Sequence, residues 1–379
     1  MQKSEHLVLY RKYRPQRFSD VVGQDHIVNV LKNALRLERV SHAYIFSGTR
    51  GTGKTTLARL LAKAFNCEKR GVEGEPCNAC DICREFSSGK AFDLVEIDAA
   101  SNRGIDDIRE LKEAVRFTPM RARRKVYIID EVHMLTKEAF NALLKTLEEP
   151  PAHAMFIMAT TELDRVPDTI LSRSQSFEFR RISESVIREE LLRVAKSEKY
   201  KIDAECITML AFLADGSMRD AETMLGQVMD ACPDSADKDV LTNLFGLPKI
   251  GQIHELLDSA LRREPVRILD TLTQIRKDGI DPKILSRMLV HEARELFVSA
   301  YNPKDLERLQ KELSESHSAF FVSHHTLPRK DIEQLLVKLL EAHNIGFRGT
   351  FPDLPLELAL LALSEQEPQK TFEKPAFLK

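Results

Sequence analysis

A glycine-rich loop that ends in Lys-Thr carries the clearest chemistry in the sequence. It reads Gly48-Thr49-Arg50-Gly51-Thr52-Gly53-Lys54-Thr55, after the apolar run 43–46 and before good helix formers that start at Thr56. This spacing is typical of a phosphate-binding loop, in which glycines turn backbone N–H groups toward an anion and the next helix adds partial positive charge. The pattern predicts that Lys54 meets the outer phosphates of a nucleotide and that the Thr55 hydroxyl holds Mg²⁺. The alternative is a Gly/Thr-rich turn that binds nothing, and the strand–loop–helix context argues against it.

Two carboxylates, Asp130 and Glu131, directly follow a second apolar run, Val126–Ile129. An apolar strand that ends in two acids is typical of a nucleotide-hydrolysing site, where one carboxylate holds Mg²⁺ and the next acts on the attacking water. We predict these roles for Asp130 and Glu131 respectively. The alternative is a strand that merely ends in acids at a sheet edge. We expect His133 to be structural.

Three further polar positions lie where such a site needs them. Thr160 and Thr161 end the next apolar strand, and a hydroxyl there can orient the attacking water. Arg173 follows a short helical turn, and Arg219 lies at the start of a later helix. An arginine near a transferring phosphate stabilises it strongly, although a single arginine is more often an exposed or ion-paired residue. The sequence alone does not select between these two interpretations of the arginines.

Four cysteines lie in an insert between the phosphate-loop helix and the next strand: Cys67, Cys77, Cys80 and Cys83. Thiolates at this spacing predict a tetrahedral Zn²⁺ site, closed and therefore structural. The insert is too short to bury a core of its own, so a metal would supply its folding energy. A disulfide pair, disfavoured in a reducing cytosol, or an iron–sulfur cluster are the alternatives. The other two cysteines, Cys206 and Cys232, are predicted to be small core residues.

Apolar strand-like runs alternate with helical patterns from about residue 25 to 180, which indicates a parallel α/β sheet with helices on both faces. Beyond residue 180 the strands stop, and apolar residues recur at helical spacing. We therefore predict an α/β domain over 1–180 with a zinc module at about 67–83, helical domains over 181–243 and 244–363, and a disordered tail over 364–379. The five expected strands are Ala43–Phe46, Asp93–Ile97, Val126–Ile129, Ala154–Ala159 and Ser176–Phe179.

Composition and charge constrain the function only weakly. Lys and Arg number 56 and Asp and Glu number 58, a net charge of -2. This balance neither indicates nor excludes nucleic-acid binding, because local patches matter more than the sum. No apolar run approaches the ~20 residues of a membrane span, and the N-terminus lacks the apolar core of a signal peptide. We expect a cytoplasmic protein without membrane contact.

Further motifs make the sequence resemble a known family. Together with the glycine loop and the cysteine insert, they are similar to the gamma/tau subunits of bacterial DNA polymerase III, which are clamp loader ATPases of the AAA+ class. The resemblance is strong over residues 7–245; beyond them it rests on helical pattern and on a closing segment similar to the family's oligomerising collar. It implies a P-loop AAA+ domain with a zinc insert, then an all-α lid domain and an all-α collar domain. The motifs are Tyr10–Phe18, Val21–Gln24, Asp130–Leu135, Asn141–Pro151, Gly216–Ala221 and Pro355–Leu361.

The resemblance also implies roles for individual residues, and it agrees with those predicted above for the glycine loop and the two acids. It makes Thr160 or Thr161 the first sensor, Arg219 the second sensor, and Arg173 a finger that reaches the ATP of a neighbouring subunit. The residues implied to bind ATP are Tyr10, Arg11, Tyr13, Arg14, Pro15, Val21, Val22, Gly23, Gly48, Thr49, Arg50, Gly51, Thr52, Gly53, Lys54, Thr55, Thr56 and Arg219.

The activity implied by the resemblance is DNA-stimulated ATP hydrolysis that loads a ring-shaped sliding clamp onto primed DNA, with ATP, Mg²⁺ and Zn²⁺ as cofactors. The implied partners are delta-type and delta-prime-type subunits, further copies of the chain, the clamp and primed DNA. No polymerase active site is recognised, and the length resembles a gamma form or a truncated one. A non-hydrolysing subunit of the same assembly and an AAA+ motor of another purpose, such as branch migration, are the alternatives.

Two positions depart from the family pattern, and two segments are candidates for DNA contact. Ser174 stands where the family usually has cysteine, and Gly226 stands where it has an acid. Asn102–Gly104 at a helix start offers backbone N–H groups to phosphate. The basic run Arg121–Lys125 is the second candidate. For that run a solvated loop before a strand is the alternative, because charge runs are usually solvated.

Overall fold

The computed structural model describes residues 7–312, 315–347 and 350–364. The chain divides into two compact units, the first ending at Asp237 and the second beginning at Lys238. The predicted division into three domains stays a prediction, and the predicted tail lies, apart from Ser364, outside the described residues. Among the described helices, none is both long and apolar enough to cross a membrane.

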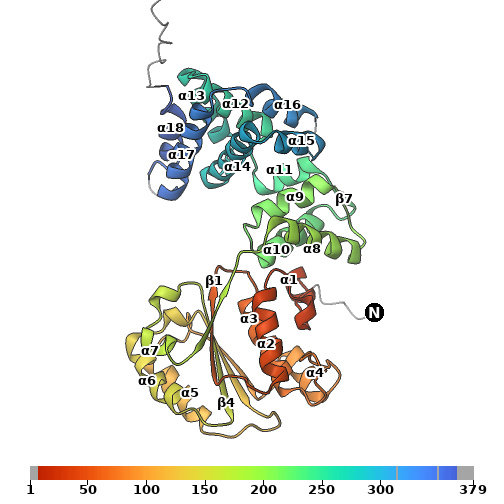
Figure 1. The fold of residues 1–379 in the computed structure, drawn as a ribbon, viewed down its shortest axis with the longest axis vertical. Helices are drawn as coiled ribbons and strands as arrows, with labels where there is room; N and C mark the ends of the chain where they lie inside the picture. The colour runs from red at the N-terminus through yellow and green to blue at the C-terminus, as the bar shows by residue number, and fades with distance from the viewer. Residues whose placement is uncertain (1–6, 313–314, 348–349, 365–379) are drawn as a thin grey trace, which may run out of the picture. The chain divides into compact units, whose positions relative to one another are not determined.

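The first unit is built on a five-stranded sheet whose strands all run parallel (Figure 1). The order across the sheet is β2-β3-β4-β1-β5. All five predicted strands are confirmed, and each end lies within two residues of its predicted place. The strands are β1 (Ala43–Gly48), β2 (Leu94–Asp98), β3 (Lys125–Asp130), β4 (Ala154–Thr160) and β5 (Gln175–Phe179).

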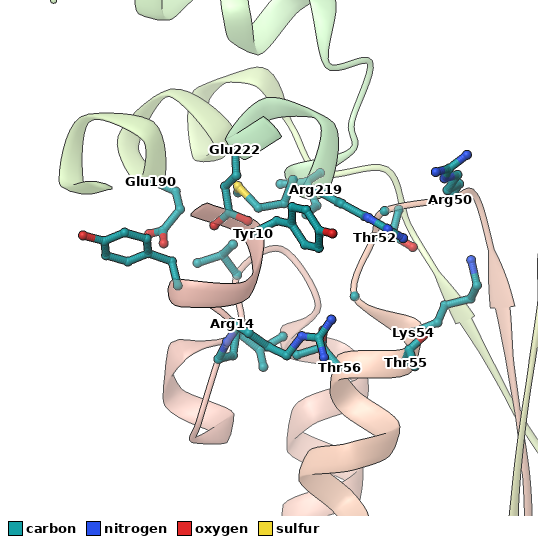
Figure 2. Close-up of a pocket in the computed structure, with 18 of the residues that line it drawn as sticks. Tyr10, Arg14, Arg50, Thr52, Lys54, Thr55, Thr56, Glu190, Arg219 and Glu222 are labelled. Atoms are coloured by element: carbon teal, nitrogen blue, oxygen red, sulfur yellow. The ribbon is translucent and has the colours of Figure 1, made fainter. Parts of the chain in front are cut away.

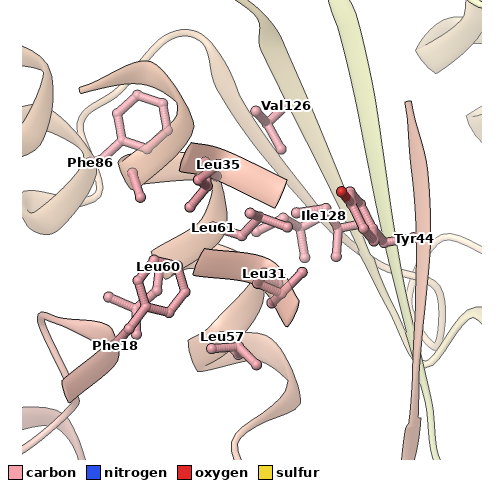
Figure 3. Packing of buried hydrophobic residues seen from close by; sticks show 14 of the residues in the cluster. Phe18, Leu31, Leu35, Tyr44, Leu57, Leu60, Leu61, Phe86, Val126 and Ile128 are labelled. Atoms are coloured by element: carbon pink, nitrogen blue, oxygen red, sulfur yellow. The ribbon is translucent and has the colours of Figure 1, made fainter. Parts of the chain in front are cut away.

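Helices cover both faces of this sheet, as the alternating pattern predicts, because central strands buried on both sides leave two apolar surfaces to cover. On one face, Tyr44 of β1 belongs to one apolar cluster with Leu57 and Leu61 (Figure 3). On the other face, β1 residue Ile45 belongs to a second cluster, with residues of the helices over 105–115, 137–148 and 168–171. The helices are α1 (Leu9–Lys12), α2 (Asp25–Arg36), α3 (Lys54–Asn66) and α4 (Asp81–Ser88), then α5 (Ile105–Val115), α6 (Lys137–Glu148) and α7 (Asp168–Leu171).

The chain then forms a helical part that completes the first unit. The expectation that strands stop at residue 180 is wrong in one detail, because β6 (Lys201–Ile202) pairs in parallel with β7 (Ser235–Ala236). This short ladder satisfies backbone groups in the segments before and after the helices, where no helical hydrogen bond is available. The helices of this part are α8 (Glu184–Ser197), α9 (Ala204–Leu213) and α10 (Met218–Ala231).

Every described element of the second unit is a helix. Apolar spacing predicts helices over Ile253–Leu261, Val266–Ile275, Pro282–Val298 and Ile332–His343, and each of them is found within three residues of its predicted ends. The closing segment Pro355–Leu361 is also helical. The spacing gives no separate helix for 238–245, for 303–312, which is very polar, or for 315–324, which has no clear apolar face. The helices are α11 (Lys238–Phe245), α12 (Ile250–Leu261), α13 (Pro265–Lys277), α14 (Pro282–Tyr301), α15 (Pro303–Glu312), α16 (Glu315–His324), α17 (Arg329–Ile345) and α18 (Leu354–Leu361).

Candidate nucleotide site

The glycine loop joins the carboxyl end of β1 to the first turn of α3, as its sequence predicts. Two of its glycines are required by close approaches at positive φ. A Cβ on Gly48 (φ 137°) would lie 2.4 Å from the carbonyl oxygen of Phe179, and one on Gly51 (φ 77°) would lie 1.8 Å from Ser217 Oγ. Gly51 therefore lets the loop pass directly beside the helical part of the unit.

Lys54, the first residue of α3, is buried against its own loop. Its Nζ donates hydrogen bonds to the carbonyl oxygens of Gly48, at 2.7 Å, and of Thr49, at 2.8 Å. Burial lowers the pKa of Lys54, and the nearby carboxylates of Glu131 and Asp130 act in the opposite direction. The ammonium group is thus held at the mouth of the loop, where the phosphates of a nucleotide would lie.

Strand ends bring the hydroxyl and carboxyl groups together, because the carboxyl ends of parallel strands meet at one edge of a sheet. Thr55 Oγ1 donates to Asp130 Oδ2 at 2.8 Å. Asp98 lies opposite Asp130 in the β2–β3 register. Thr161 Oγ1 donates to Glu131 Oε2 at 3.0 Å. These contacts come from four separate segments of the chain.

Thr160 and Thr161, which the sequence does not tell apart, have different surroundings. The Thr160 side chain is buried; its hydroxyl bonds the backbone of Glu162 and lies 3.0 Å from His133 Nδ1. The same imidazole nitrogen lies 3.5 Å from Glu131 Oε2. His133 therefore contacts both Thr160 and Glu131, and its expected structural role stays a prediction.

A cavity of about 350 Å³ lies between the glycine loop, the N-terminal segment and the helical part (Figure 2). In Figure 2, Glu190, Glu222 and Arg219 reach toward it from the helical part, opposite the first turn of α3. The predicted residues that line it are Tyr10, Tyr13, Arg14, Pro15, Val21, Val22, Arg50, Gly51, Thr52, Gly53, Lys54, Thr55, Thr56, Asp130, Glu131 and Arg219. Unpredicted lining residues are Asp20, Asp98, Ile182, Glu190, Met218 and Glu222.

Helix α10 positions the residues that enter the cavity from the helical part. Its N-cap is Ser217, whose hydroxyl accepts a hydrogen bond from the Asp220 N–H at 3.2 Å. In the same first turn the Arg219 guanidinium lies 4.9 Å from the ring centroid of Tyr10. This contact ties the N-terminal segment to the helix that carries Arg219. Gly226 of α10 faces α1, but a Cβ there would make only an ordinary contact with the Leu9 side chain, at 3.7 Å, so this packing does not explain the glycine.

A pair of acids at the cavity wall is the least expected feature of the site. Burial, and then the charge of Glu190, raise the pKa of Glu222 to about 8, while Arg193 and Arg14 act in the opposite direction. Glu222 follows Met218 by one helical turn, so both lie on the same face of α10. That spacing is the only sequence signal for Glu222, and it appears only once Met218 is known to face the cavity.

Several predicted ATP-binding and catalytic residues do not line the cavity. The carbonyl oxygens of Gly48 and Thr49 accept hydrogen bonds from Lys54 instead, and the Thr161 hydroxyl donates one to Glu131. Arg173 donates to the Thr169 carbonyl at 2.7 Å and forms an ion pair with Glu148. The predicted residues outside the lining are Arg11, Gly23, Gly48, Thr49, Thr160, Thr161 and Arg173.

The two candidate DNA segments are occupied by contacts within the chain. The Gly104 N–H at the start of α5 already donates to Asp107 Oδ2 at 2.9 Å. In the basic run, the Arg121 guanidinium pairs with Glu85. The Arg124 guanidinium lies 5.0 Å from the ring centroid of Phe65. These contacts favour the solvated-loop interpretation of the basic run.

The four cysteines of the insert converge, with their sulfur atoms within 4.8 Å of one another. Cys77 Sγ and Cys83 Sγ lie 3.9 Å apart, close to the ~3.8 Å that two thiolates span on one zinc ion. All four are free thiols, which excludes the disulfide alternative in this structure. Backbone N–H groups of Ala79 and Cys80 point at Cys77 Sγ, at 3.4 and 3.3 Å. The donor set and its geometry therefore fit a tetrahedral metal ion.

The structure also shows the surroundings of the two other cysteines, Cys206 and Cys232, and of Ser174. Cys206 is buried as predicted, but Cys232 is only half-buried, because it ends α10 and its carbonyl accepts a hydrogen bond from Tyr200 at 2.6 Å. Ser174 Oγ is buried and has no hydrogen-bond partner. A cysteine at this position would leave no hydroxyl group unpaired, and an unpaired hydroxyl is expensive to bury.

Two family models match this chain. One is described as the delta subunit of DNA polymerase III and matches residues 23–183. The other is the ATPase lid domain of the DNA polymerase III clamp loader subunit, which matches residues 186–232. The chain is also similar, at 18% identity and a TM-score of 0.46, to the RuvB Holliday junction branch migration motor of Thermotoga maritima, over 65% of this chain and 78% of that chain.

Comparisons of the amino-acid sequence give relatives of higher identity. The chain is 38% identical to the DNA polymerase III subunit tau of Bacillus subtilis, over 97% of its own length and 65% of the relative's. It is 43% identical to the tau subunit of Escherichia coli over 72% of this chain and 42% of that protein, so it spans only part of these tau relatives. It is 41% identical to the gamma subunit of Buchnera aphidicola subsp. Acyrthosiphon pisum, over 74% of this chain and 78% of the relative. The chain therefore belongs to the gamma/tau subunit family of bacterial DNA polymerase III.

Proposed function

We propose that this protein is an ATP-hydrolysing motor subunit of a bacterial clamp loader, which loads a ring-shaped sliding clamp onto primed DNA. One observation carries the proposal: Lys54, the Thr55–Asp130 pair and the Thr161–Glu131 pair meet at one sheet edge, beneath Arg219. That set supplies a cation for phosphate, oxygen ligands for a metal ion and a carboxylate for water. A non-hydrolysing subunit would have no need of the last of these.

The residues divide the work according to their contacts. Lys54 holds the outer phosphates, and it exchanges its bonds to the loop carbonyls for bonds to the nucleotide. Glu131 orients the attacking water, with Thr161 fixing one carboxylate oxygen. His133 bonds Thr160, which keeps the sheet edge in register around that carboxylate. Arg219 approaches the phosphates from α10.

The oxygen pair of Thr55 and Asp130 suits Mg²⁺, which prefers hard oxygen ligands and keeps several waters. When bound, Mg²⁺ would supply positive charge that offsets the negative charge developing on the phosphates. In the insert, the four thiolates suit Zn²⁺ in a closed, structural site. The insert contributes little apolar core of its own, so zinc would hold its loop and α4 together.

Arg173 acts on a neighbouring subunit in this proposal. Its guanidinium is partly exposed, pairs with Glu148 and does not line the cavity of its own chain. A finger that completes the ATP site of the next protomer would need this outward position. The proposed assembly contains further copies of the chain together with delta-type and delta-prime-type subunits, and it acts in the cytoplasm on the clamp and primed DNA. The descriptions of the two matching family models support this proposal.

The decisive experiment compares ATP turnover with and without primed DNA and clamp, in the presence of the companion subunits. We expect strong stimulation in the wild type and a loss of about 100-fold or more in Lys54→Ala, because a charge aimed at the phosphates is removed. Lys196→Ala, an exposed lysine at the end of α8, is the matched control and should keep full activity. Unchanged turnover in Lys54→Ala would defeat the motor proposal.

A further inference from the structure

A cluster of metal-ligand side chains lies in the second unit, within which His254 of α12, Glu292 of α14 and His317 of α16 meet. Their ligand atoms all lie within 4.8 Å of one another. His254 Nε2 lies 3.2 Å from Glu292 Oε2, and His317 Nε2 lies 2.9 Å from the same oxygen. Two imidazole nitrogens from separate helices thus face a single carboxylate oxygen.

The carboxylate of the cluster is buried, and the two imidazole rings are half-buried and held in place. Glu292 is 5% exposed, and aromatic side chains back both imidazoles. The His254 ring stacks on Phe320, with centroids 4.0 Å apart and planes 7° apart. The His317 ring lies 5.7 Å from Phe321. Rotamers fixed in this way lower the entropy that ligand ordering would otherwise cost on metal binding.

We propose that His254, Glu292 and His317 form a second metal site, which takes a divalent ion of the zinc class. Two imidazoles and one carboxylate are a donor set that Zn²⁺ accepts readily, and they leave a fourth position for water. Donor atoms around one zinc ion lie about 3.3 Å apart, and two of the three donor pairs already have such distances. The ion would join α12, α14 and α16.

Metal binding replaces protons in this cluster. Without metal, a proton on either Nε2 facing Glu292 would be donated to the carboxylate. Zn²⁺ takes the lone pairs of both Nε2 atoms and one carboxylate oxygen, and the displaced protons go to solvent or to the Nδ1 atoms. His291 faces the other carboxylate oxygen, with its Nδ1 3.4 Å from Glu292 Oε1. That contact stays in place and orients the carboxylate.

The alternative is that these residues form an ion-pair network and nothing more. Counting ions separates the two, provided that the cysteine site is counted independently. We would measure zinc bound per full-length chain by equilibrium dialysis and elemental analysis, for the wild type, His254→Ala, His317→Ala and Glu292→Gln. His325→Ala is the control, because this half-buried imidazole follows α16 and bonds the Val322 carbonyl.

We expect the wild type and His325→Ala to bind one zinc ion more than each of the three cluster variants, whose affinity at this site falls more than tenfold. Substitution with Co²⁺ distinguishes the two sites by their absorption, because only the cysteine site gives thiolate-to-metal charge-transfer bands. His254→Ala should lose the Co²⁺ bands of the proposed site and keep those of the cysteine site. Zinc should also raise the midpoint of thermal unfolding of Cys80→Ser, in which only the new site is intact. Equal zinc content in wild type and cluster variants would overturn the proposal.

Discussion

Glu222 offers a quantitative test of how the nucleotide cavity is built. Its carboxyl group is 5% exposed and shares the cavity wall with Glu190. Burial, and then the charge of Glu190, raise its pKa from the model-compound value of 4.5 to about 8. At ~1.4 kcal/mol for each pKa unit, ionising this group in the folded protein costs on the order of 4 to 5 kcal/mol.

The sign of the resulting pH dependence follows from proton uptake. Between pH 4.5 and about 8 the folded protein keeps the Glu222 proton, while the unfolded chain has lost it. The folded state therefore binds more protons, and the free energy of unfolding decreases as pH rises through this window. Below the window Glu222 contributes no penalty, and above it the penalty is complete.

Glu222→Gln removes the titrating group and keeps the size of the side chain. We expect the variant to be more stable than the wild type by about 1 kcal/mol at pH 5.5 and by about 4 kcal/mol at pH 8.5. The assay is urea unfolding at four pH values across this range, followed by hydrogen exchange of α10 amides so that the first unit is observed by itself.

Glu189→Gln is the matched control, because Glu189 lies on α8 beside Glu190 and is exposed. This variant should follow the wild-type pH dependence within a few tenths of a kcal/mol. If Glu222→Gln and the wild type have parallel stability curves from pH 5.5 to 8.5, Glu222 is not buried as an uncharged acid, and the reasoning fails.

Three shorter predictions concern the loop, the water-orienting contact and the insert. Gly51→Ala should weaken ATP binding at least tenfold, because its Cβ would lie 1.8 Å from Ser217 Oγ. Gly53→Ala is the control, because its Cβ meets nothing within 4 Å and adds only the smaller strain of a positive φ. Equal effects of the two variants on ATP affinity would refute the role of the close approach. Thr161→Val should lower the ATPase rate about tenfold or more with little change in ATP affinity, since it frees one Glu131 oxygen, and single-turnover kinetics would reveal any contrary effect on binding. Cys80→Ser should lose the zinc of the insert, and the insert should become more sensitive to proteolysis even when zinc is added. If the insert of the metal-free wild type were fully protected, the ion would not be structural.

Local sequence patterns predicted the sheet and the chemistry at its edge. A strand such as β4 is apolar throughout because it is buried on both faces, so its position in the sequence is unambiguous. Lys54, Thr55 and Asp130 follow strand ends, and parallel topology alone brings strand ends to a common edge. The cysteines were predictable for a similar reason, because three of them lie within seven residues of sequence, Cys77–Cys83.

Other features depend on contacts between distant segments. Nothing local to α10 says that Glu222 faces the acid Glu190, since the partner comes from α8 and the meeting depends on how the two helices pack. The contacts of His133 could be seen only when the strand carrying Thr160 was placed beside it. The two-residue ladder of β6 and β7 is too short to leave a pattern.

The sequence by itself determined which segments become strands, where the phosphate loop turns and which thiols lie together, because each depends on residues close along the chain. The tertiary structure decided which acid stays protonated, which threonine touches Glu131, and that His254, Glu292 and His317 from three helices share one buried point. The physical reason is that burial and charge–charge interaction act through space, so a side chain's pKa and its ligands depend on neighbours that sequence order does not reveal.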